Sequence, residues 1–380
     1  MSLLFNNQDV NIPQTHVFII GVGGYPHISG GHSEKEQTVD AAKQLGQLSS
    51  PPKSAEAFYN SIIKLHAENA WIRPLGSIEV LLSPLANDES TFAGQNIDSA
   101  NISNITNAYW EWKERCDRHP DNVAIFYFCG HGFEKDEQYL LTEDFGKTPH
   151  NPWTGCFAFD LTRRGFSTCK ANTQLFFVDA CRQITSDMLT TDFRVLPIDP
   201  PNLLAKDCLY RLTQQAAAIN ESAYGKKNDV SFYTQALIKA LCGDASTGDD
   251  GDWVVNTGVL ASKMTSFIKN IASDQGYKQR CISTTSDVTD IIRFIEPPSL
   301  SLTVTCAPFN ALRFAELSYH NLNTDSGNRR SPETNPWQVD IKPGIYRIQA
   351  DFPGSQYINI PVFKSLMPPS DSQTLKCQQS

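Results

Sequence analysis

The sequence lacks the features that mark exported, membrane-bound and nucleic-acid-binding proteins. Residues 1–8 contain no basic segment followed by an apolar core, and the longest apolar runs, near Val17–Val22 and Val123–Cys129, are far too short to span a bilayer. The chain has a formal charge of −9 and no stripe rich in lysine and arginine that would neutralise phosphates. We therefore expect a cytoplasmic protein that binds neither membranes nor nucleic acids.

Paired cysteines, internal repeats and low-complexity tracts are also absent. The ten cysteines are spread from Cys116 to Cys377, no two of them form a CxxC pair, and several lie inside apolar runs. Reduced thiols in a cytosol therefore explain the cysteines better than a disulfide framework. At 380 residues and 40% hydrophobic content, the chain is long enough for one large globular domain and a smaller one.

The first 295 residues or so alternate between apolar runs and helical patterns, which predicts a βαβ sheet of parallel strands. Strands are expected at His16–Val22 and Ile78–Leu82 and in the two runs that lead to His131 and Cys181. Helices are expected over residues 54–63, 102–112, 231–241 and 260–271.

A change of pattern at Glu296–Ser299, which contains two prolines, predicts a domain boundary. Beyond it, alternating apolar and polar residues predict a small β-sandwich over residues 297–366, with Trp337–Ile341 and Tyr346–Phe352 paired in a hairpin. We expect a first domain over residues 1–296 and a flexible tail over 367–380.

Two fully apolar runs each end abruptly in a reactive group: the first leads to His131 and Gly132, and the second to Asp179 and Cys181. Buried parallel strands deliver side chains to one edge of a sheet in this way. A thiol with an ordinary pKa of about 8.5 needs a neighbouring base to become a nucleophile. We therefore predict a Cys181 nucleophile with a His131 base. Gly132 and Cys181 would offer backbone N–H groups to an oxyanion.

The segments Cys129–Gly132 and Asp179–Arg182, whose histidine and cysteine are fifty residues apart, resemble the two catalytic motifs of the caspase-like cysteine peptidases (clan CD, peptidase family C14, bacterial caspase and metacaspase branch). The resemblance covers roughly residues 12–295. It implies an α/β fold, a three-layer αβα sandwich with a mostly parallel central sheet, followed here by the small all-β sandwich. It also implies that His131 is the general base, Cys181 the nucleophile, and Gly132 and Cys181 the oxyanion hole.

Asp179 stands where animal caspases have glutamine, two residues before the nucleophile. A buried carboxylate there suits a lysine or arginine side chain of the substrate. Metacaspases also place an acid at this position and cut after basic residues, so we expect cleavage after Arg or Lys. Arg182-Gln183 departs from the His-Ser-Gly usual in metacaspases, so the resemblance assigns no residues to the other wall of the pocket.

No cofactor is expected, although one calcium site stays open. Some metacaspases depend on calcium, and four acidic residues cluster around Gly248 and Gly251, but their spacing does not match an EF-hand loop. These residues are Asp244, Asp249, Asp250 and Asp252. The Lys226-Lys227 pair is either a self-cleavage site or a solvated loop.

The resemblance further implies a regulated effector of a bacterial antiviral defence or cell-death system. Its substrate would be a protein or peptide, and a partner protein or a nucleotide second messenger would activate it. Two alternatives stay open. The first is a catalytically silent scaffold that recruits proteins through its β-domain. The second is a ligand-sensing protein whose β-domain binds the nucleotide.

Overall fold

The computed structural model describes residues 2–85, 95–184, 193–202, 208–248, 252–354 and 356–379. The chain forms two compact units, one from residues 1–238 and 256–291, the other from residues 239–255 and 292–380. Residues 239–255, which fall within the predicted first domain, thus belong to the second unit. The boundary predicted at residue 297 stays a prediction.

The first unit is built on a seven-stranded sheet in the order β1-β3-β2-β4-β8-β9-β11. The five inner strands run parallel, and the two edge strands β1 and β11 pair antiparallel. The strands are β1 (Leu3–Asn6), β2 (Thr15–Val22), β3 (Leu75–Ser83), β4 (Val123–Gly130), β8 (Thr173–Ala180), β9 (Tyr210–Gln215) and β11 (Ile282–Thr285). The four strands β2, β3, β4 and β8 are buried along their whole length, as strands covered on both faces must be.

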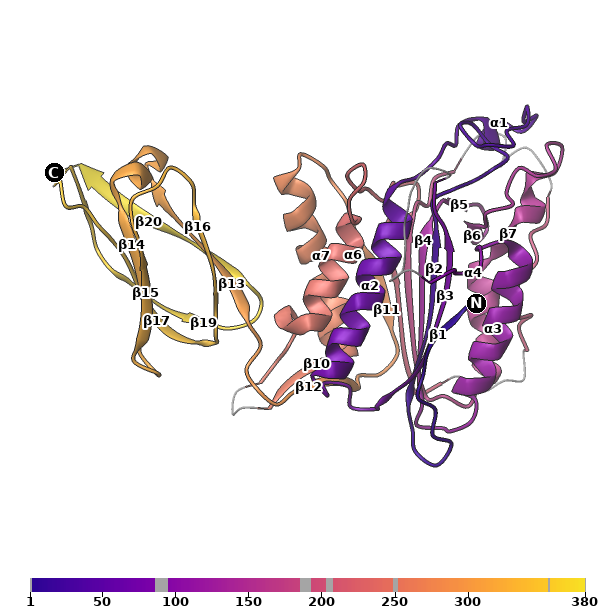
Figure 1. Ribbon diagram of the computed structural model, residues 1–380, viewed down its shortest axis with the longest axis horizontal. Helices are drawn as coiled ribbons and strands as arrows, with labels where there is room; N and C mark the ends of the chain where they lie inside the picture. Colours follow the sequence, from indigo (N-terminus) through magenta and orange to yellow (C-terminus); the bar gives the residue numbers. More distant parts are fainter. Residues whose placement is uncertain are drawn as a thin grey trace. The chain divides into compact units, whose positions relative to one another are not determined.

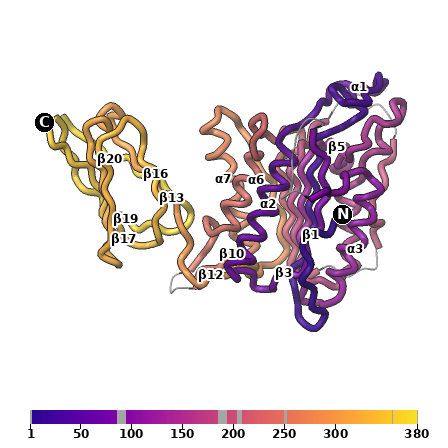
Figure 2. Tube along the Cα trace, viewed as in Figure 1, coloured from indigo at the N-terminus to yellow at the C-terminus, as the bar shows by residue number. Residues whose placement is uncertain are grey.

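Helices cover both faces of this sheet, which confirms the predicted α/β class (Figure 1). Helices α2 (Ser50–Ala67), α6 (Phe232–Lys239) and α7 (Thr257–Asp274) lie on one face, and α3 (Ile102–Cys116) and α4 (Phe159–Gly165) on the other. Prolines in the first turn of α2 fit its start, and the Asn101 side chain caps α3 by accepting from the Asn104 N–H. A short helix, α1 (Asp40–Lys43), lies at the same end of the sheet as β5, as Figures 1 and 2 show.

Two smaller sheets lie outside the central sheet, one in the first unit and one made mostly of residues of the second unit. Strands β5 (Gly132–Glu134), β6 (Gln138–Leu141) and β7 (Cys156–Ala158) follow β4 and form an antiparallel sheet of their own. Strands β10 (Trp253–Asn256) and β12 (Asp290–Phe294) pair with each other. The first of these sheets begins at Gly132 and therefore fixes the path of the chain directly after the predicted base, His131.

The second unit contains two four-stranded sheets, β16-β13-β20-β18 and β15-β14-β17-β19, so the predicted C-terminal all-β region is confirmed. Burial alternates along β13 and β17 as expected for strands with one face in a core. The first sheet holds β13 (Leu300–Ala307), β16 (Trp337–Ile341), β18 (Tyr357–Asn359) and β20 (Asp371–Gln379). The second holds β14 (Glu316–Asn321), β15 (Ser326–Arg330), β17 (Gly344–Asp351) and β19 (Val362–Leu366).

Two predictions for this region are wrong. Residues 367–380 were expected to be flexible, but Asp371–Gln379 forms β20, which pairs with β13 and β18 and buries Leu375 and Cys377 in the core. The predicted hairpin is not formed either, because β16 pairs with β13 and β17 pairs with β14 in the other sheet. Alternation fixes which side chains face the core but not which strands are neighbours.

Candidate active site

The fifty-residue spacing of the two motifs equals the offset between paired residues of β4 and β8. Strands β4 and β8 pair in parallel, with Cys129 opposite Asp179 and Gly130 opposite Ala180. The same offset continues past the sheet, where Phe133 bridges Gln183. His131 and Cys181 lie between these pairs at the same offset. They therefore lie side by side on adjacent chains, which are about 4.8 Å apart in a sheet.

Gly132 allows the two chains to come this close. A Cβ atom at position 132 would lie 2.8 Å from the carbonyl oxygen of Cys181 and 3.0 Å from Ala180 Cβ, so a larger residue would push the segments apart. His131, Cys181 and Asp179 all line one cavity of about 570 Å³ at the carboxyl edge of the sheet. The structure thus brings together all four residues predicted from the sequence.

His131 is held at both its backbone and its ring. Its backbone N–H donates to Tyr25 Oη at 2.8 Å, and its Nε2 lies 2.8 Å from the Gly46 carbonyl oxygen. A carbonyl only accepts, so Nε2 carries the proton and Nδ1 is the free base. Burial lowers the pKa of His131 to about 4, against the hydrogen bond to Gly46, which raises it. The imidazole is therefore neutral at neutral pH.

Cys181 is half-buried, and its Sγ accepts a hydrogen bond from the Ala223 N–H at 3.3 Å. Burial raises the pKa of the thiol, and the Ala223 hydrogen bond acts in the opposite direction. The resting pair is therefore a neutral thiol beside a neutral imidazole. These protonation states favour proton transfer during attack over a thiolate formed in advance.

Asp179 points to the same side of β8 as Cys181, since residues two apart on a strand share a face. It is buried, and its Oδ2 accepts from Thr234 Oγ1 at 2.8 Å, from Cys129 Sγ at 3.4 Å and from Ser231 Oγ. Burial raises the pKa of the carboxyl group, whereas these hydrogen bonds lower it. Three hydrogen bonds thus hold one oxygen of a carboxyl group that lines the cavity.

Several groups of this site carry no signal in the sequence. Gly46 and Ala223 act through backbone atoms, and the Gly46 carbonyl is 85 residues from His131 along the chain. Tyr25 follows β2 and is fully buried, with a ring centroid 5.0 Å from that of His131. Glu134 and Arg182 form a buried ion pair behind the site. Only Arg182 was noticed in the sequence, as a departure from the metacaspase pattern.

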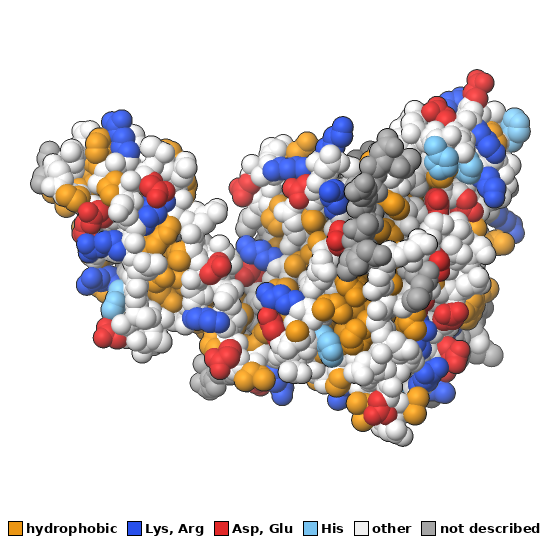
Figure 3. Space-filling model, viewed as in Figure 1, with side chains coloured by type: hydrophobic (Ala, Val, Ile, Leu, Met, Phe, Trp, Pro, Cys, Tyr) orange, Lys and Arg blue, Asp and Glu red, His pale blue; other side chains and the backbone are white. Residues whose placement is uncertain are grey.

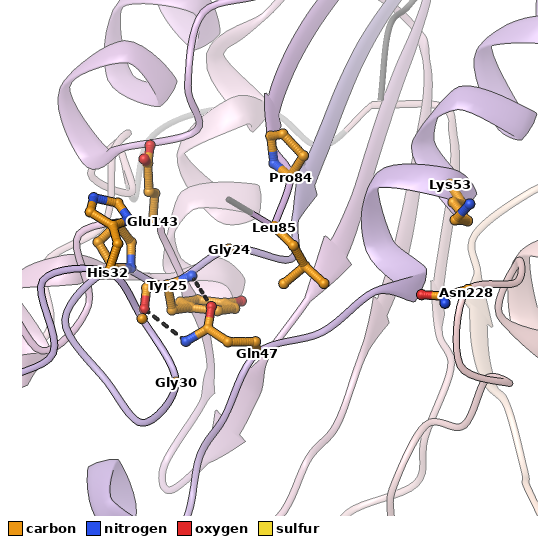
Figure 4. A pocket seen from close by; sticks show the side chains of 12 residues that line it. Gly24, Tyr25, Gly30, His32, Gln47, Lys53, Pro84, Leu85, Glu143 and Asn228 are labelled. Atoms are coloured by element: carbon orange, nitrogen blue, oxygen red, sulfur yellow. Dashed lines mark hydrogen bonds between the residues drawn. The ribbon is translucent and has the colours of Figure 1, made fainter. Parts of the chain in front are cut away.

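A second cavity of about 520 Å³ adjoins the first and shares Gln47 and Leu85 with it. Gln47 accepts from the Tyr25 N–H at 2.8 Å and donates to the Tyr25 carbonyl at 2.9 Å, as Figure 4 shows. These two bonds fix the segment that presents the Gly46 carbonyl to His131. The orientation of the base therefore depends on contacts along the N-terminal segment.

Other predicted features are placed as follows. Lys226 and Lys227 are exposed and line the same cavity as Cys181. Of the proposed calcium ligands, Asp249 and Asp250 lie outside the described residues, and no cluster of acidic, histidine or cysteine side chains that could hold a metal occurs in the part that is described. No described helix is both long and apolar enough to cross a bilayer. Positive and negative side chains are interspersed on the visible face of the first unit (Figure 3).

The caspase domain family matches residues 82–290, which include both motifs and more than half of the chain. The chain belongs to the caspase domain family. Over 208 residues, this caspase-domain protein is 29% identical to the uncharacterized protein y4kE of Sinorhizobium fredii. The match covers 52% of this chain and 58% of that relative, so the chain spans less than two thirds of the relative's length.

Among solved structures, the caspase-domain chain is similar to protein GSU0716 from Geobacter sulfurreducens, with 12% identity and a TM-score of 0.42. The likeness covers 72% of this chain and 94% of the other. A TM-score of this size adds nothing to the assignment. The family match implies a cysteine peptidase, and His131 and Cys181 lie within the matched residues.

Proposed function

We propose that the protein is a cysteine endopeptidase that uses His131 and Cys181. Nδ1 of His131 takes the proton of the Cys181 thiol as Sγ attacks the carbonyl carbon of the scissile peptide bond. The carbonyl oxygen becomes an oxyanion, to which Gly132 and Cys181 donate their backbone N–H groups. When the intermediate collapses, the C–N bond breaks and His131 returns the proton to the leaving amine. Water then hydrolyses the thioester and frees Cys181.

The single observation that carries this proposal is the shared register of His131 and Cys181 at the end of β4 and β8. Parallel strands place both side chains on one side of the sheet edge, and one cavity opens to both of them. The Gly46 carbonyl orients the ring so that one nitrogen is free to act as base.

Cleavage after Arg or Lys follows from the carboxyl group of Asp179, which lies two residues from the nucleophile on the same face of β8. Two residues along a strand correspond to about 6.6 Å, a distance that a long basic side chain bridges when its carbonyl lies at Cys181. A carboxylate in a partly closed cavity favours a guanidinium or ammonium group and disfavours an acidic side chain.

A panel of fluorogenic peptides that differ only in Arg, Lys or Asp at the cleaved position tests this function. Wild-type protein should cleave the Arg and Lys peptides and leave the Asp peptide intact, and Cys181→Ala should cleave none. Cleavage of the Asp peptide would refute the assigned role of Asp179. Absence of turnover under every activating condition would favour the silent scaffold.

Regulation by a partner protein or a nucleotide messenger, within a bacterial defence or cell-death system, remains part of the proposal. The feature that supports it is the second unit, whose described residues include a core of seventeen buried ones, so that it can carry a separate binding function. A nucleotide that binds there should raise the melting temperature of wild type and Cys181→Ala alike. Unchanged melting temperatures with cyclic and linear nucleotides would exclude these nucleotides as ligands of the second unit.

A further inference from the structure

A buried ion pair lies directly behind the residues proposed to be catalytic. Arg182 follows Cys181, and its guanidinium group donates from Nε to Glu134 Oε2 at 2.9 Å and from Nη2 to Glu134 Oε1 at 3.0 Å. Both side chains are less than a tenth exposed. A two-pronged pair of this kind fixes the relative orientation of its partners as well as their distance.

The pair connects the two segments that carry the proposed oxyanion donors. Glu134 lies two residues after Gly132 in β5, and Arg182 lies one residue after Cys181. The backbone adds a second tie, since the Glu134 N–H donates to the Gln183 carbonyl at 3.0 Å. The ion pair therefore reinforces this backbone hydrogen bond in holding the two segments in register beyond the sheet.

Further hydrogen bonds extend from Arg182 back to the nucleophile. Its Nη1 donates to Gln215 Oε1 at 3.1 Å, Gln215 Nε2 donates to Gln138 Oε1 at 2.9 Å, and Gln138 Nε2 reaches the Cys181 carbonyl at 3.4 Å. The Arg182 backbone N–H donates to the Glu221 carbonyl at 3.1 Å. The chain around Cys181 is thus held by the Glu221 carbonyl at its backbone and by a hydrogen-bond series that begins at the Arg182 guanidinium.

We propose that Arg182 and Glu134 are positioning residues, which hold the N–H groups of Gly132 and Cys181 at the spacing that an oxyanion requires. The inference rests on the proposed peptidase function. Neither side chain is among the residues that line the catalytic cavity, so the pair acts through the backbone and not on the substrate. Misplacement of a reacting group by about 1 Å costs on the order of a hundredfold in rate, so small movements here are sufficient.

The test uses Glu134→Gln, which removes the charge and keeps the shape, and Arg182→Lys, which keeps the charge and loses the two-pronged contact. Each should lower kcat on an Arg peptide by about tenfold to a hundredfold and leave KM nearly unchanged. Alkylation of Cys181 by iodoacetamide should keep its wild-type rate, because attack on a saturated carbon forms no oxyanion. A merely structural role would not separate these two rates.

Asp199→Asn is the matched control, because Asp199 forms a similarly buried ion pair with Lys113 of α3. The Asp199 side chain is 6% exposed and the Lys113 side chain 11%. It should lower the melting temperature and leave kcat unchanged. The inference is overturned if the wild type cleaves the peptide and Glu134→Gln and Arg182→Lys do so at the wild-type kcat. It is also overturned if their alkylation rate falls with kcat, or if Asp199→Asn lowers kcat equally. If the wild type cleaves no peptide, the proposed function itself fails.

Discussion

The carboxyl edge of the central sheet and the C-terminal β-sandwich use strands in opposite ways. Strands β4 and β8 are buried on both faces, so their polar residues collect at their ends, where Cys129, His131, Asp179 and Cys181 share one cavity. The strands of the sandwich alternate, so each contributes core residues on one face and exposed ones on the other. Reactive groups therefore accumulate where parallel strands stop, whereas the sandwich supplies a separate module with its own core.

The largest effect should come from removing the reactive groups at the sheet edge. Cys181→Ala should lower kcat/KM on an Arg peptide by about 10⁴-fold or more, because no second nucleophile replaces the thiol. His131→Ala should have an effect of similar size, since the resting thiol is protonated. Steady-state peptide assays measure both effects, with melting temperatures as the control for folding. Retained activity in either variant would place the chemistry elsewhere in the molecule.

Removing the charge of Asp179 should have the next largest effect. Asp179→Asn should reduce kcat/KM for an Arg peptide by about 10²- to 10³-fold, because a buried guanidinium would lose its partner. A peptide with norleucine at the cleaved position is the control and should lose little. Ser231→Ala, which removes one hydrogen bond to Oδ2, should have a smaller effect of the same sign. Equal losses on both peptides would indicate that Asp179 supports the fold and not specificity.

A cavity in the sandwich should affect stability and leave the sheet edge intact. Ile348 is fully buried in β17, and Ile348→Ala should cost about 2–5 kcal/mol of unfolding free energy. Hydrogen exchange should speed up in β14 and β17 and stay unchanged in β4 and β8. The alkylation rate of Cys181 is the control. If that rate falls in Ile348→Ala, the two regions are not as separate as their strand patterns indicate.

The smallest effect concerns pH. Burial raises the pKa of the Cys181 thiol, so the rate of its alkylation should still be rising as pH increases through the range where an ordinary thiol titrates, and should not level off near neutrality. Burial also raises the pKa of Asp179, and its carboxylate is lost as pH falls through that value. The acid limb of kcat/KM should therefore lie at higher pH for the Arg peptide than for the norleucine peptide. Coincident limbs would contradict the role of Asp179.

Much of the fold and site could be predicted because the signals are local. The apolar runs before His131 and Cys181 identify buried strands, and their equal lengths and fifty-residue separation correspond to the observed register. Strand neighbours in the sandwich could not be predicted, because alternation along β16 and β17 is compatible with one hairpin or with two sheets. The strand at Asp371–Gln379 was missed because it is largely polar, and only Leu375 and Cys377 are buried in the core.

The partners of the site lie beyond such local signals. The Gly46 carbonyl and the Ala223 N–H are backbone groups that every residue other than proline has, so the residue type does not indicate their role. Glu134 and Arg182 are ordinary charged residues in the sequence, and only their burial and mutual geometry reveal the pair. Long-range contacts of this kind are set by the tertiary fold.

Labelling by a peptidyl chloromethyl ketone that ends in arginine, mapped by peptide mass spectrometry, tests most directly whether Cys181 is the nucleophile and whether the site accepts a basic side chain. The thiol displaces chloride, so each reacted cysteine gains one peptidyl group. We predict one label per chain, on Cys181 among the ten cysteines, with much slower labelling in His131→Ala and for a reagent that ends in aspartate. A label on another cysteine, or equal labelling by the aspartate reagent, would contradict it.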